Sequence, residues 1–156
     1  MEAALRTAVE KLSGEELKSL DFTEVRGTDG IKEASYTVNG MEVKVCVVSG
    51  LANANTIMEK VKNGTADYHF IEIMGCPGGC VNGGGQPIQH AVVRNFVDLR
   101  ARRAAALYEA DKDMPLRKSH ESETVKRLYA EFLGEPGSHK AHEVLHTSYV
   151  ARPKYK

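Results

Sequence analysis

The 156-residue chain contains no tryptophan, only three cysteines and no net charge, because 21 basic side chains balance 21 acidic ones. Three cysteines are an odd number and too few for a disulfide framework, so we expect free thiols in a reducing compartment. The apolar runs are short, such as Val45 to Val48, whereas a membrane-spanning helix needs about 20 apolar residues. The balanced charge provides no basic surface for nucleic acid. We therefore expect partners that are neither membranes nor nucleic acids.

A secretory signal is also missing from the first residues. Met1 to Arg6 has the pattern of an amphipathic helix and lacks the basic and apolar regions of a leader peptide. Together with the free thiols, this favours a cytoplasmic protein. The length and the 42% apolar content fit a globular domain of ordinary size.

The hydrophobic pattern predicts an α/β fold. Apolar residues recur at helical spacing over 2–13 and 51–62, and strand-like runs cover 22–26, 31–38, 41–48 and 68–74, the last of them mostly buried. Asn39 and Gly40 separate two of these runs, and this pair is typical of a tight hairpin. Further helices are expected over 89–110, around 125–133 and from Ser138 to about Tyr149. The expected architecture is a mixed β-sheet flanked by helices, with a helical carboxyl-terminal segment.

Residues 75–87 are unusually rich in glycine and hold two of the three cysteines. Six of the chain's 14 glycines lie there, at positions 75, 78, 79, 83, 84 and 85. Neither a helix nor a regular strand persists through so many glycines. Cys76 and Cys80 follow the predicted strand 68–74, and α/β folds bind ligands at the carboxyl ends of strands. Because thiolates are soft ligands for zinc, copper(I) and iron-sulfur clusters, the pair indicates a metal or cluster site.

Other sites built from cysteine or glycine fit this loop less well. A zinc ribbon needs two Cys-x-x-Cys pairs, and a phosphate-binding loop needs a lysine after its glycines; neither is present. A redox-active dithiol, or a pair of buried structural thiols, remains compatible with Cys76 and Cys80 taken alone. Cys46 lies among apolar residues of the predicted strand 41–48, so we expect a buried core thiol there rather than a ligand.

The stretch from Met74 to Pro87, Met-Gly-Cys-Pro-Gly-Gly-Cys-Val-Asn-Gly-Gly-Gly-Gln-Pro, closely resembles the third cluster-binding motif of the iron-only, or FeFe, hydrogenases. The resemblance extends over nearly the whole chain. It includes the segments at residues 1–7, 25–27, 30–34, 68–72, 117–121 and 138–147.

This resemblance implies that the cofactor is the H-cluster, a 4Fe-4S cubane joined by a cysteine thiolate to a diiron subsite that carries CO, cyanide and a dithiolate bridge. By motif position, Cys76 would be a cubane ligand and Cys80 the thiolate that bridges the cubane and the diiron subsite. Met74 would pack its thioether against the diiron subsite, although the residue pattern alone indicates an ordinary core methionine. The implied reaction is the reversible reduction of two protons to H₂, with a ferredoxin-like electron carrier as partner.

The loop supplies only half of the four thiolates that normally hold a cubane. In the resembling family, the motifs Thr-Ser-Cys-Cys-Pro and Pro-Cys-x-x-Lys supply the other ligands, and this sequence contains neither. We therefore expect a carboxyl-terminal portion of the catalytic domain that is active only with a complementary chain. Residues 1–115 would form the carboxyl-terminal lobe with the loop, and residues 116–156 a helical tail that resembles the small-subunit segment. The alternative is a non-catalytic, hydrogenase-like iron-sulfur assembly or H₂-sensor protein.

Two further patterns are given structural interpretations. His142 to His146, His-Glu-Val-Leu-His, matches the zinc metalloprotease signature, but only ten residues follow it to build a third ligand and a cleft. We expect these histidines to make structural hydrogen bonds instead. The cluster of Arg100, Arg102 and Arg103 is expected to be the solvated face of a helix, and a docking site for an acidic electron-transfer partner is the alternative.

Overall fold

A computed structural model of the protein describes residues 1–153. The chain divides into two compact units, of which the first is Met1–Arg117 and the second begins at Lys118. Among the described residues, no helix is both long enough and apolar enough to cross a membrane.

The first unit contains a three-stranded mixed sheet with the order β1-β2-β3. Strands β1 (Ile31–Val38) and β2 (Met41–Ser49) are antiparallel and joined by a tight turn, in which Asn39 and Gly40 have φ angles of 49° and 78°. Helix α2 (Leu51–Lys62) then returns the chain so that β3 (Phe70–Met74) pairs with β2 in parallel. The α/β class, the mixed sheet and the hairpin are therefore as the sequence predicts.

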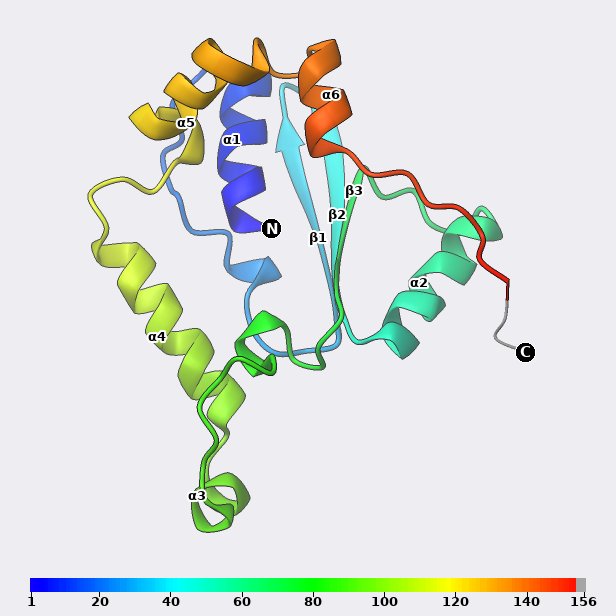
Figure 1. The fold of residues 1–156 in the computed structure, drawn as a ribbon, viewed down its shortest axis with the longest axis vertical. Coiled ribbons are helices and arrows are strands. Elements are labelled where there is room, and N and C mark those ends of the chain that lie inside the picture. The colour runs from blue at the N-terminus through cyan, green and yellow to red at the C-terminus, as the bar shows by residue number, and fades with distance from the viewer. Residues whose placement is uncertain (154–156) are drawn as a thin grey trace. The chain divides into compact units, whose positions relative to one another are not determined.

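Helices cover both faces of this sheet. Helix α1 (Glu2–Ser13) lies on one face and α2 on the other (Figure 1). Because side chains alternate along a strand, Val45 and Val47 of β2 pack on the side of α1, while Cys46 and Val48 pack on the side of α2. The sheet thus separates two hydrophobic clusters.

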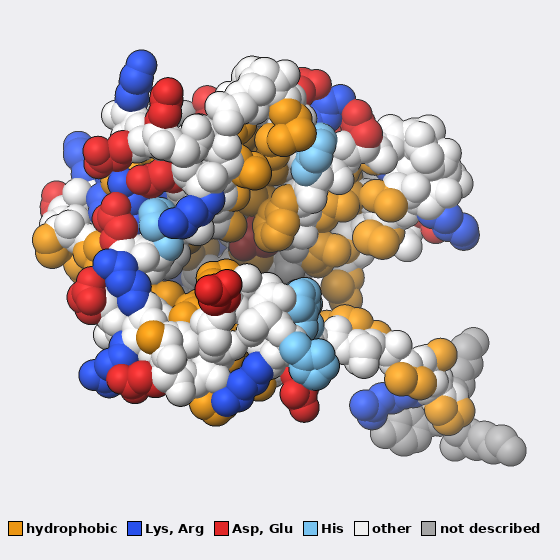
Figure 2. Space-filling view, turned by 90° about the horizontal axis from the view of Figure 1, so that it is seen from above, with side chains coloured by type: hydrophobic (Ala, Val, Ile, Leu, Met, Phe, Trp, Pro, Cys, Tyr) orange, Lys and Arg blue, Asp and Glu red, His pale blue; other side chains and the backbone are white. Residues whose placement is uncertain are grey.

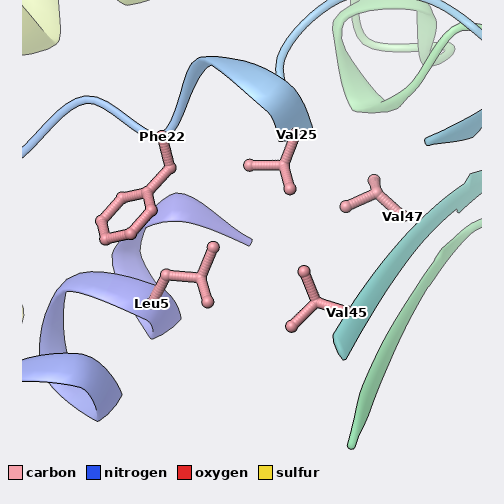
Figure 3. Packing of buried hydrophobic residues seen from close by; sticks show 5 residues of the cluster. All are labelled: Leu5, Phe22, Val25, Val45 and Val47. Carbon is pink, nitrogen blue, oxygen red and sulfur yellow. The ribbon is translucent and has the colours of Figure 1, made fainter. Parts of the chain in front are cut away.

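The cluster beneath α1 joins segments that are distant in sequence. Figure 3 shows Leu5 of α1 directed toward Val45 and Val47 of β2, with Phe22 and Val25 closing the cluster from the connecting segment. All five side chains are buried. This packing fixes the start of α1 against the sheet.

A network of charged groups connects α1 to α4 (Leu99–Asp113). The Arg6 side chain is almost fully buried, and its Nη1 and Nη2 atoms each donate a 2.8 Å hydrogen bond to the Asp111 carboxylate. Arg117 Nη2 donates a third bond to the same carboxylate at 2.7 Å. These arginines, Arg6 foremost, hold the pKa of the Asp111 carboxyl well below its usual range.

Three expectations for the first unit are wrong in detail. Residues 22–26 form a short 3-10 turn, η1 (Thr23–Val25), rather than a strand; the Arg26 amide donates to the Thr23 carbonyl within the turn at 3.1 Å. Strand β3 begins at Phe70 and is not mostly buried, because Phe70 and Ile73 are 50% and 45% exposed. The helix expected over 89–110 is two helices, α3 (Ala91–Phe96) and α4, since Asp98 accepts a hydrogen bond from the Ala101 amide and begins a new helix.

The second unit is helical throughout its regular structure. Its elements are η3 (Ser119–Glu121), α5 (Glu123–Leu128), the π-helical turn η4 (Tyr129–Leu133) and α6 (His139–Leu145). Gly134, with a φ of 80°, ends the first helical stretch, and the Ser138 hydroxyl caps α6 by accepting from the Ala141 amide. Helix α6 ends four residues before the expected Tyr149, whose side chain is 94% exposed and has no apolar surface to pack on.

The exposed surface mixes both signs of charge with apolar side chains. Figure 2 shows lysine and arginine interspersed with aspartate and glutamate, and hydrophobic side chains open to solvent on the same face. Large apolar residues with at least half of their surface exposed in the first unit include Leu51, Phe70, Val92 and Phe96.

Candidate metal-cluster site

The glycine-rich loop begins where β3 leaves the sheet. Met74, the last residue of β3, lies opposite Ser49 of β2, and the Gly50 amide donates to the Met74 carbonyl at 2.9 Å. The loop therefore starts from a fixed position at the carboxyl end of two parallel strands, the end at which such sheets bind ligands.

Two glycines turn the chain between the cysteines. Gly78 and Gly79 have φ angles of 79° and 92°, which side chains with a Cβ rarely adopt. The Gly79 amide donates to the Cys76 carbonyl at 3.0 Å, and Cys80 then begins the short 3-10 turn η2 (Cys80–Asn82). Both thiols are free; Cys76 is half-buried and Cys80 is exposed. The turn thus presents two thiols from one short loop.

Residues outside the loop hold its backbone in place. The buried Ser49 hydroxyl accepts a hydrogen bond from the Gly78 amide at 3.2 Å. Arg103 of α4 donates to the carbonyls of Val81 and Pro87 at 3.4 and 2.9 Å. A Cβ added at Gly78 would lie 2.5 Å from Cδ of Arg100, so this arginine packs directly on the glycine backbone.

These contacts were missed by sequence reasoning, which assigned Arg100 and Arg103 to a solvated helix face. That assignment is wrong for Arg103, which is half-buried and bonded to the loop. The only signal in the sequence was the glycine at position 78, because a glycine often marks a close approach by another group. The identity of that group depends on tertiary packing.

A cavity of about 370 Å³ lies beside the loop within the first unit. Its walls come from the start of α1, the α1 face of the sheet, α4 and the loop itself, and they include Met74, Gly79, Cys80 and Tyr108. The Met74 thioether reaches the loop, since a Cβ added at Gly79 would lie 3.4 Å from its sulfur. The cavity therefore places a thiol and a thioether on one wall.

Charged side chains of the sheet also line this cavity. Lys32 and Glu72 flank Val47 in one row of the three strands. Burial lowers the pKa of the Lys32 ammonium, and the negative charges of Asp29 and Glu72 oppose that shift. Lys32 donates to the Gly27 carbonyl at 3.0 Å, so a largely buried cation is fixed in the cavity wall.

Comparison with known families identifies the chain. Residues 1–84, just over half of its length, match the family described as the iron-only hydrogenase large subunit, C-terminal domain. The chain belongs to the iron-only hydrogenase family. Residues 97–152 match a second family of these enzymes, the iron hydrogenase small subunit.

The similarity to known proteins covers almost all of this chain. The NADP-reducing hydrogenase subunit HndD of Solidesulfovibrio fructosivorans is 46% identical over 99% of the chain, which spans 26% of HndD. The probable cytosolic Fe-S cluster assembly factor AAEL012261 of Aedes aegypti is 35% identical over 95% of the chain, which spans 30% of that protein. A variant of the FeFe-hydrogenase HydA1 from Chlamydomonas reinhardtii has a similar structure, with a TM-score of 0.72 and 40% identity, covering 96% of this chain and 43% of that one. The chain thus spans about a quarter to a third of these curated relatives.

The donor set of this family member fits part of an iron-sulfur cluster. Cys76, Cys80 and the Met74 thioether are soft donors around one loop. A Cβ added at Gly84 or Gly85 would meet no atom within 4 Å, so the space beside these two glycines is open. Cys46 is fully buried on the opposite face of the sheet, against α2, and burial raises the pKa of its thiol. Two cysteines, rather than three, are therefore available at the loop.

Proposed function

We propose that this chain is the carboxyl-terminal portion of the catalytic domain of an FeFe hydrogenase, in which Cys76 and Cys80 are two of the ligands of the H-cluster. The observation that carries the proposal is the loop itself, which presents both thiols beside the Met74 thioether at the carboxyl end of β3. When bound, the H-cluster would supply the electron transfer and H₂ chemistry of the reaction 2 H⁺ + 2 e⁻ ⇌ H₂.

Each residue of the loop has a separate proposed role. Cys76 would hold the cubane part of the H-cluster, and Cys80 would supply the thiolate shared with its diiron subsite. Met74 would pack its flexible, polarizable thioether at the diiron subsite, a role that suits a side chain lying against Gly79. The side chains of Ser49 and Arg103 would orient these donors, because Ser49 accepts from the Gly78 amide and Arg103 donates to the Val81 carbonyl.

The proposal requires ligands from outside these 156 residues. A cubane takes four thiolates, and the loop provides two, while Cys46 is buried on the far face of the sheet. We infer that a complementary polypeptide with the motifs Thr-Ser-Cys-Cys-Pro and Pro-Cys-x-x-Lys completes the set. Residues 1–115 form the lobe that meets it, and residues 116–156 form the small-subunit-like tail.

The proposal is tested by comparing the chain alone with the chain expressed beside such a complementary polypeptide under anaerobic conditions. We expect the assembled complex to retain iron and to exchange H₂ with D₂, and the isolated chain to hold no complete cluster. Cys76→Ser and Cys80→Ser in the complex should each abolish exchange. Cys46→Ala is the matched control and should retain iron and activity. A fully loaded isolated chain, or a complex indifferent to both loop substitutions, would contradict the proposal.

The alternative is a non-catalytic, hydrogenase-like iron-sulfur assembly or H₂-sensor protein. The 35% identity to the probable cytosolic Fe-S cluster assembly factor of Aedes aegypti supports this alternative, since that similarity also covers 95% of the chain. The same complex separates the two functions. A relative of this class would retain iron through Cys76 and Cys80 and show no exchange of H₂ with D₂.

The electron partner and the compartment complete the proposal. A hydrogenase of this type needs a one-electron carrier, and a ferredoxin-like protein is the proposed partner. Three free thiols suit a reducing compartment, so we propose the cytoplasm. Reduction of the reconstituted complex by a ferredoxin, followed through H₂ production, tests the first of these statements.

A further inference from the structure

We propose that His142 and His146 form a Zn²⁺ site in the second unit, independent of the cysteine loop. The two imidazoles are solvent-exposed, and their Nδ1 atoms lie 3.3 Å apart. Neither side chain takes part in the proposed hydrogenase site. The chemical class of ligand is a divalent metal ion that prefers nitrogen donors and tetrahedral geometry.

Helix α6, which contains His142 and ends just before His146, is held in place by several contacts. The His146 amide donates to the His142 carbonyl at 3.1 Å, so the two residues are one helical turn apart. The Ser138 cap fixes the start of α6, and the Lys140 ammonium lies 3.9 Å from the centre of the Phe132 ring of η4. These contacts hold α6 against the preceding helical turn.

The distance between the two nitrogens matches a tetrahedral zinc ion. Zinc binds histidine nitrogen at about 2.0–2.1 Å, and two such bonds at a tetrahedral angle separate the nitrogens by about 3.3–3.4 Å. An octahedral ion with bonds of the same length would bring the nitrogens to about 3.0 Å. The observed 3.3 Å between His142 and His146 favours the tetrahedral arrangement. The ring planes are inclined by 68°, with centroids 4.5 Å apart, so the rings are not stacked face to face.

The site has open coordination positions. Within residues 1–153, no third histidine, cysteine or carboxylate joins this pair in a cluster of metal ligands. Water would complete the coordination, because both rings are exposed. This donor set differs from that of a zinc protease, which has three protein ligands, so the proposal is a binding site and includes no hydrolysis.

A direct hydrogen bond between the two rings is the competing explanation of the same distance. If one Nδ1 carries a proton, it can donate to the other at 3.3 Å without any metal. The two explanations differ in their response to added metal. A hydrogen-bonded histidine pair that binds no metal would not give the spectrum of tetrahedral cobalt.

The test uses Co²⁺ as a spectroscopic substitute for zinc and the full chain with Cys76→Ser and Cys80→Ser, so that the loop thiols do not compete. Cys46 is fully buried and does not offer a third thiol. We expect one Co²⁺ per chain, with the intense visible bands of tetrahedral cobalt, and displacement by Zn²⁺. Binding should weaken in acid, because imidazole ligands must be neutral.

Substitutions locate the site. His142→Ala and His146→Ala, and likewise His142→Gln and His146→Gln, should each weaken Co²⁺ binding at least about tenfold, since loss even of an outer partner of a metal ligand has an effect of that size. His139→Ala is the matched control on the same helix and should bind as before. No binding, an octahedral spectrum, or equal binding in the His139 and His142 variants would overturn the proposal. Because all three histidines are exposed, these substitutions leave the core intact.

Discussion

Gly79 is the residue at which the loop geometry is most easily tested. Its φ of 92° and ψ of −178° lie in a region that is essentially restricted to glycine. A Cβ at this position would make only ordinary contact with the Met74 sulfur, at 3.4 Å. The effect of Gly79→Ala therefore comes from the backbone and not from a steric clash with a neighbour.

The expected magnitude follows from this conformation. Holding a residue with a Cβ in such a region costs about 1–3 kcal/mol. If the loop keeps its shape, the free energy of unfolding falls by that amount, and the urea midpoint falls by roughly 0.5–1.5 M for a chain of this size. If the loop relaxes instead, the amide bond from Gly79 to the Cys76 carbonyl is lost and the two thiols separate.

Two measurements distinguish these outcomes. Urea unfolding of the chain reports the first, and iron retention in the complex with the complementary polypeptide reports the second. Gly85→Ala is the matched control, because Gly85 has no positive φ and an added Cβ meets nothing within 4 Å. If Gly79→Ala equals Gly85→Ala in both measurements, the reasoning about the loop backbone is refuted.

Three other substitutions test the surroundings of the loop. Cys46→Ala should lower the free energy of unfolding by about 1–2 kcal/mol through a small cavity, without loss of iron from the complex, as urea unfolding and metal analysis would show. Asp111→Asn should lower the free energy of unfolding by about 2–3 kcal/mol at pH 7 by removing the charged partner of buried Arg6. Because the folded-state pKa of Asp111 is depressed, its contribution is present above the unfolded value near about 3.9 and is lost below it, so urea midpoints of the two proteins should converge in acid. Arg103→Ala should reduce iron retention by freeing two loop carbonyls, whereas the exposed Arg102→Ala should not; equal retention would contradict the role of Arg103.

Local patterns predicted the regular elements well where the pattern was long. The helical spacing of α1 and α2 and the alternation in β1 and β2 gave bounds that agree with the structure to within one residue. The pair Asn39 and Gly40 predicted the hairpin because both residues accept positive φ. These signals lie within a few residues of one another and do not depend on distant contacts.

Short patterns failed because they do not define a partner. Phe22 and Val25 are buried, but a run of five residues fits a 3-10 turn as well as a strand when no neighbouring strand is available. The break between α3 and α4 had a readable signal in Asp98, which is a strong N-cap residue. The apolar residues on both sides of Asp98 instead suggested one continuous helix.

The residues of the candidate site also fall into those that the local sequence predicts and those that it does not. Cys76 and Cys80 could be found from the sequence because their glycines and spacing lie within one loop. Ser49, Arg100 and Arg103 could not, because each meets the loop from more than 15 residues away along the chain through the packing of β2 and α4. The residue type alone does not indicate which group an arginine on an exposed helix will contact.

The supporting contacts bear on the proposal that this chain supplies half of a ligand set. Ser49 holds Gly78 from the sheet, Arg103 holds Val81 from α4, and the Gly79 amide closes the turn on Cys76. None of these contacts requires a metal or a second chain. The loop backbone that carries both thiols is therefore held by this chain's own fold, so that in the proposed complex the complementary polypeptide would bring its ligands to a loop already in shape.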